Sequence, residues 1–89
     1  MNALPGQDVV ERGVEDLRQS KITAEALLVS IGAPRLRRLG IDVPEGIREP
    51  ERGLYDLLTE TSGDAAHSRY NALVRLLVSY ERAAECGGL

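Results

Sequence analysis

The polar residues around His67 are the first place in this sequence where chemistry is to be expected. Asp64, His67 and Arg69 lie at the predicted start of the last helix, where free backbone amides and the helix dipole favour an anion. The guanidinium of Arg69 would add a forked donor for a phosphate or a carboxylate. A general base would also need an orienting carboxylate or a nucleophile within reach, which this spacing does not supply. The interpretations are an anion site, or ordinary capping and surface polarity, and we expect no enzyme.

Three arginines, Arg35, Arg37 and Arg38, stand within four residues. They follow a short apolar segment and the corner at residues 32–34, an order that resembles a helix-turn-helix, whose second helix would enter the DNA major groove. The predicted second helix is short, however, and the net charge of −3 argues against a dedicated nucleic-acid-binding protein. Three interpretations follow: contact with nucleic acid, docking of an acidic partner surface, or a solvated surface.

Metal and cofactor chemistry is not indicated. The single His67 and the single Cys86 are too few for a closed zinc site, and one cysteine cannot form a disulfide within the chain. The phosphate-loop, dinucleotide and nucleophile-elbow motifs do not occur. Carboxylates gather in residues 45–60, but arginines are interspersed among them and the spacing is not that of a calcium loop. We expect neither a metal nor a cofactor.

The composition favours a small helical domain. The chain has 89 residues, of which 43% are hydrophobic and 28% are charged, and three tyrosines are its only aromatic residues. Leucine and alanine must therefore build most of the core, and both favour helices over strands. No apolar run reaches the ~18 residues of a membrane span, and the first residues lack the pattern of a secretory signal. We expect a single domain over residues 1–89, in the cytoplasm and without membrane contact.

Capping and breaking residues predict where the helices begin and end. Asp8, Thr23 and Asp64 are expected N-caps, and Gly32 is expected to end the second helix. Pro34 and Pro50 fit the first position of a helix. The expected helices cover residues 9–20, 24–31, 50–61 and 65–86, with a fifth short turn at 34–39.

The segment over residues 41–49 has no helical period and is predicted to be the longest loop. Its apolar members Ile41, Val43 and Ile47 are expected to hold it against the core. The ends, residues 1–7 and 87–89, are expected to be flexible.

The last helix carries an apolar seam at alternating spacings of four and three residues, formed by Ala66, Tyr70, Leu73, Leu77, Tyr80 and Ala84. Such spacing is typical of the a and d positions of a helix that packs along its length. More apolar residues lie beside the seam between 72 and 84, so over half of the helix surface is apolar there. The other helices are short, and we therefore expect a second copy of the chain to cover this face. The alternative is a monomer whose small helices wrap the last one.

Together these patterns predict an all-α fold, a small four- to five-helix bundle with the last helix as its spine. The leading functional hypothesis is a non-enzymatic interaction module, a small regulatory or accessory protein that acts through a homodimeric or partner-binding helix surface. The alternative is a nucleic-acid-binding regulator that uses the three arginines. An anion-binding or catalytic site around His67 is the third hypothesis.

Overall fold

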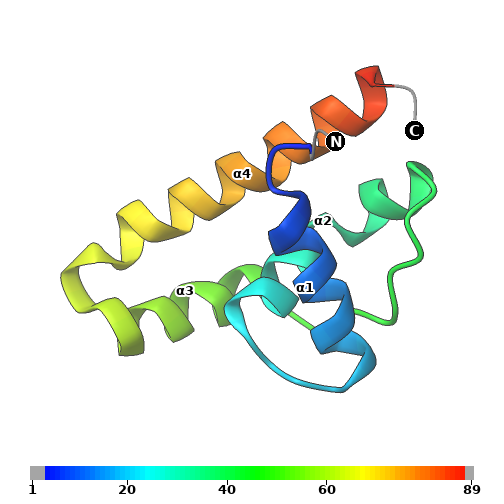
Figure 1. Ribbon diagram of the computed structural model, residues 1–89. Coiled ribbons are helices and arrows are strands. Elements are labelled where there is room, and N and C mark those ends of the chain that lie inside the picture. The colour runs from blue at the N-terminus through cyan, green and yellow to red at the C-terminus, as the bar shows by residue number, and fades with distance from the viewer. Residues whose placement is uncertain (1–3, 88–89) are drawn as a thin grey trace.

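Helices are the only regular secondary structure in the part of the chain that the structure describes. The computed structural model describes residues 4–87, and within them it has four α-helices, one short 3₁₀ turn and no strand. The elements are α1 (Gln7–Arg18), α2 (Ala24–Arg38), α3 (Pro50–Ser62), the turn η1 (Gly63–Ala65) and α4 (Ala66–Cys86) (Figure 1). The predicted all-α fold is confirmed.

Helix α2 is the centre of the molecule. It packs against α1, α3 and α4, whereas α4 lies along one side, beside α3 and α2 (Figure 1). Eight of the fifteen residues of α2 are buried: Ala26, Leu27, Leu28, Val29, Ser30, Gly32, Ala33 and Leu36. The prediction that the last helix forms the spine is therefore wrong. The first two turns of α2, residues 24–31, carry one charge in eight residues, and this apolar segment is surrounded because it needs cover on most sides.

Helix α2 also runs without interruption through the residues expected to break it. Gly32 lies where α4 comes close, since a Cβ atom there would lie 3.0 Å from Glu81 Oε2 and from Leu77 Cδ1. It therefore serves close packing and does not end the helix. Pro34 lies inside the helix on its exposed side. Residues 24–31 and 34–38 thus belong to one element, and the predicted four- to five-helix arrangement with a turn at 34–39 is not matched.

One of the three predicted side-chain caps is present. The Thr23 side chain accepts a hydrogen bond from the Ala26 amide at 3.1 Å. Helix α1 begins earlier than expected, after Gly6 in a left-handed conformation, so Asp8 lies in the first turn and not at the cap. Asp64 lies in η1, and the residue that precedes α4 is Ala65, which makes no side-chain cap bond.

The loop between α2 and α3 is held by its apolar residues and by one hydroxyl. Val43 is buried, and Ile41 and Ile47 pack partly buried against the core. The Ser30 hydroxyl accepts a hydrogen bond from the Ile47 amide at 3.0 Å and donates one to the Ala26 carbonyl at 2.8 Å. The path of the loop is therefore fixed from the central helix.

The predicted flexible ends lie partly outside the described residues, which exclude 1–3 and 88–89. Within the described part, Leu4 packs against the core and Gln7 already belongs to α1. Residues 4–7 are thus part of the folded domain.

Candidate functional site

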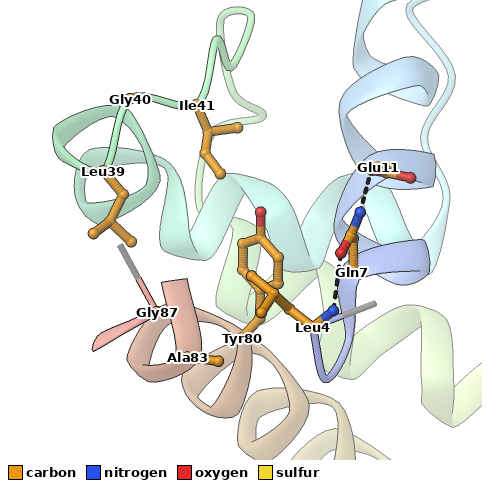
Figure 2. Close-up of a pocket in the computed structure, with 9 residues that line it drawn as sticks. All are labelled: Leu4, Gln7, Glu11, Leu39, Gly40, Ile41, Tyr80, Ala83 and Gly87. Atoms are coloured by element: carbon orange, nitrogen blue, oxygen red, sulfur yellow. Dashed lines mark hydrogen bonds between the residues drawn. The ribbon is translucent and has the colours of Figure 1, made fainter. Parts of the chain in front are cut away.

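A cleft opens where the ends of three helices meet. Its cavity volume is about 660 Å³. Figure 2 shows its walls, which are the start of α1, the end of α2 with the segment that follows it, and the last turns of α4. The lining residues are Leu4, Gln7, Glu11, Leu39, Gly40, Ile41, Tyr80, Ala83 and Gly87.

A second hollow of about 290 Å³ adjoins the first. The two share Glu11, Ile41 and Tyr80 in their linings, so they meet at these side chains. The second hollow adds Val10, Val14, Arg18 and Asp42. We call the combined depression the Tyr80 cleft. Its α1 wall is one face of that helix, because residues 7, 11, 14 and 18 follow helical spacing.

Tyr80 forms the junction of the two hollows. Its side chain rises from α4 between Ile41 and α1, with the hydroxyl at its tip (Figure 2). Burial, and secondly the charge of Glu11, raises the pKa of the Tyr80 hydroxyl above its usual value. The group therefore stays protonated at neutral pH, where it can both donate and accept a hydrogen bond.

Gln7 orders the polar side of the cleft. Its amide nitrogen donates to Glu11 Oε2 at 3.0 Å, and its amide oxygen accepts from the backbone amide of Leu4 at 2.9 Å (Figure 2). Gln7 therefore fixes the Glu11 carboxylate and also holds the chain segment that enters α1. Glu11 Oε1 has no hydrogen-bond partner within residues 4–87.

The lining of the first hollow combines apolar and polar side chains. Apolar side chains from three elements surround a few polar groups, which is the usual composition of a ligand site. A nucleophile next to a base, the minimum for covalent catalysis, does not occur in this lining.

A buried carboxylate joins α4 to α2 near the cleft. Glu81 is only 5% exposed, and its side chain lies 3.9 Å from the Arg35 guanidinium, which also approaches Glu85 at 3.2 Å. Gly32 makes room for this carboxylate on α2. Burial raises the pKa of the Glu81 carboxyl. The Arg35 charge opposes that rise and the Glu85 charge adds to it.

The change in the free energy of unfolding with pH should show that the Glu81 carboxyl is buried. Because the folded pKa of Glu81 is raised, the folded chain binds more protons than the unfolded chain just above the unfolded pKa. The contribution of Glu81 to the free energy of unfolding therefore falls as pH rises from the unfolded pKa of the carboxyl towards its folded pKa. Relative to the wild type, Glu81→Gln should therefore gain stability as pH rises above the unfolded pKa of a glutamate, about 4.3. Urea unfolding at several pH values measures this.

The exposed Glu60→Gln is the matched control, and its stability relative to the wild type should stay flat over the same pH range. A relative loss for Glu81→Gln as pH rises would mean that the ion pair with Arg35 outweighs the cost of burial.

The three predicted arginines do not form one outward patch. Arg35 binds the carboxylates of α4, and Arg37 donates to the Val43 carbonyl at 3.2 Å and to the Pro44 carbonyl at 2.7 Å. Arg38 is exposed beside a shallow hollow of about 360 Å³. Since α2 is continuous, the resemblance to a helix-turn-helix does not extend to the structure.

The residues of the predicted anion site are all exposed. Asp64 lies in η1, and Arg69 lies on α4. His67 Nε2 lies 3.2 Å from the Asn71 side-chain nitrogen, a contact within one helix face. No group of three or more metal-binding side chains occurs within residues 4–87.

The predicted seam of α4 faces inward. Leu77, Tyr80 and Ala84 are buried in the core, and Tyr70 and Leu73 pack partly buried against it. A second copy would therefore have to dock on the rest of the α4 surface. The homodimer stays a prediction.

The spacing along α4 predicts Tyr80 as a core residue, but no pattern in the sequence predicts the cleft, and Glu81 was not among the predicted residues. The signal for Glu81 was available, because it lies four residues after Leu77 and three before Ala84, a charged position on the apolar face. The cleft gave no such signal, because its residues come from segments far apart in the sequence.

Comparison with protein-family models, with curated proteins and with solved structures gave no match for this chain. Within the described part of the chain, none of the helices has the length and apolar character needed to cross a membrane.

Proposed function

We propose that this protein is a non-enzymatic interaction module, a small regulatory or accessory protein that binds its partner in the Tyr80 cleft. The observation that carries the proposal is the lining of the cleft. Apolar residues from three helix ends, such as Leu39 and Ala83, surround the ordered polar pair of Gln7 and Glu11. A surface of this composition gains free energy when an apolar group replaces water, and its polar groups select the orientation.

The raised pKa of Tyr80 and the exposure of Glu11 favour binding over catalysis. Tyr80 has a raised pKa and is a poor nucleophile at neutral pH. Glu11 is exposed, without the burial that would prepare it as a general acid. These groups suit hydrogen bonding to a bound molecule.

The alternative, a nucleic-acid-binding regulator, has less support. Two of its three arginines already bind carboxylates or carbonyl groups of the same chain. Carboxylates on the neighbouring α4 would repel phosphate groups. Arg37 and Arg38, the two whose charge no carboxylate within residues 4–87 offsets, would give little of the charge neutralisation on which nucleic-acid affinity depends.

The proposal is tested by amide NMR spectra of the labelled protein with a set of small amphipathic molecules. Those that bind should shift the amides of residues 4–11, 39–42 and 80–87. Ala83→Trp places a large ring at the cleft wall and should weaken this binding at least tenfold, because the apolar space is filled. Amide dispersion equal to that of the wild type would show that the variant is folded.

Ala72→Trp is the control, since Ala72 is exposed on α4 and does not line the cleft. The proposal would be contradicted if the shifted amides cluster elsewhere on the protein. It would also be contradicted if the molecules bind Ala83→Trp as tightly as they bind the wild type.

A further inference from the structure

We infer that the Tyr80 cleft holds an extended peptide segment of a partner protein, which places a basic side chain against Glu11 and apolar side chains against the cleft walls. This inference rests on the proposed function and adds the chemistry of the partner.

The charges that line the cleft favour a basic group. Glu11 stands on the α1 wall and Asp42 on the opposite wall. The basic lining residue, Arg18, lies 3.5 Å from the Glu15 carboxylate, which offsets its charge. The lining therefore carries an excess of negative charge, and an ammonium or guanidinium group complements it.

The geometry at Glu11 also fits a cationic group. Gln7 occupies Oε2 and holds the carboxylate in place, and Oε1 is left to accept a hydrogen bond from a ligand. The Tyr80 hydroxyl stands at the junction of the two hollows, where it can accept a hydrogen bond from the same cation. A lysine or arginine side chain would place its apolar stem along Ile41 and Tyr80, with its charge at the rim.

The shape of the cleft favours an extended chain over a compact small molecule. Its α1 wall runs from Gln7 to Arg18, which spans about 16 Å at 1.5 Å per residue. An extended peptide of about five residues covers that length. The two hollows, one on each side of Tyr80, would take side chains of alternate residues, which point to the same face of an extended chain.

The test uses three blocked five-residue peptides of sequence Leu-Ala-X-Ala-Leu, in which X is lysine, glutamine or glutamate, so that X and both leucines point to the same face of the extended chain. NMR titration measures the dissociation constant of each peptide. The lysine peptide should bind about fivefold more tightly than the glutamine peptide, and the glutamate peptide should bind most weakly. Added salt should reduce the difference between the peptides because it screens the charge at the rim.

Glu11→Gln should remove the preference for lysine, whereas Asp8→Asn, which changes an exposed carboxylate of α1 outside the cleft, should keep it. Equal affinity for the three peptides would overturn the basic specificity and leave the proposed function intact. If butylamine alone binds as tightly as the lysine peptide, the occupant is a small cation and the peptide is excluded. If neither peptides nor the amphipathic molecules bind the cleft, the proposed function fails as well.

Discussion

Replacing Gly13 with alanine is expected to lower the free energy of unfolding by about 2–4 kcal/mol, although alanine is the better helix former. Gly13 is buried where α1 crosses α2. A Cβ atom at this position would overlap the Glu25 carbonyl oxygen and Val29 Cγ2, and would lie 2.9 Å from the Glu25 carbonyl carbon. Backbone atoms cannot rotate away as a side chain can. The two helices would have to separate, and the core between them would lose packing.

Gly53→Ala in α3 is the matched control, and urea unfolding followed by circular dichroism measures both variants. The nearest atom to a Cβ at Gly53 is Leu27 Cδ2 at 3.0 Å, the end of a flexible side chain. The helix-propensity gain of about 1 kcal/mol should offset that contact and leave the stability nearly unchanged. Equal effects of the two substitutions would contradict the close crossing of α1 and α2.

Pro34→Ala is expected to raise the free energy of unfolding by about 1–2 kcal/mol. Proline inside a helix lacks the amide that would bond to the carbonyl of Ser30, and it is less favourable there than alanine by about 3 kcal/mol. Part of this gain is lost because alanine makes the unfolded chain more flexible. The side chain at position 34 is exposed, so the substitution removes little packing.

Pro44→Ala in the loop is the control and should not stabilise the protein. Its carbonyl would still accept the bond from Arg37, while the unfolded chain would gain freedom. Thermal and urea unfolding distinguish the two variants. A loss of stability in Pro34→Ala would show that the proline ring itself supports α2.

The positions of α3 and α4 could be predicted from the sequence because local and tertiary preferences agree there. Pro50 begins α3 as predicted, and α4 covers nearly the whole predicted range. The loop at 41–49 also lies where the missing helical period placed it. In these segments the local preferences of the residues and their packing in the fold favour the same structure.

The course of α2 could not be predicted, because there burial overrides the local signals. Gly32 and Pro34 both favour the end of a helix when they are judged by their neighbours in sequence. An interruption at this point would have exposed backbone polar groups beside the buried Ala33 and Leu36. Continuing the helix costs one hydrogen bond at Pro34, and it keeps these residues in the core.

The candidate site was hidden for a different reason. The seam on α4 identified Tyr80, but the partners of Tyr80 in the cleft come from α1 and from the segment after α2. A single sequence gives the spacing within each helix and carries no information about which helix ends meet. The arginine cluster was the most conspicuous local pattern, and the fold uses two of its members to hold α4 and the loop.

The larger hollow of the Tyr80 cleft is walled by helix ends (Figure 2), whereas the core is centred on the middle of α2. Helix ends open at small free energies, and a packed centre opens only when the whole domain unfolds. Amide hydrogens at the cleft rim should therefore exchange with solvent quickly, while those of Leu28 and Val29 exchange slowly. When a partner binds, the helix ends around the cleft would shift to fit it, while the buried centre of α2 stays in place. The width of the cleft would therefore change with its occupant.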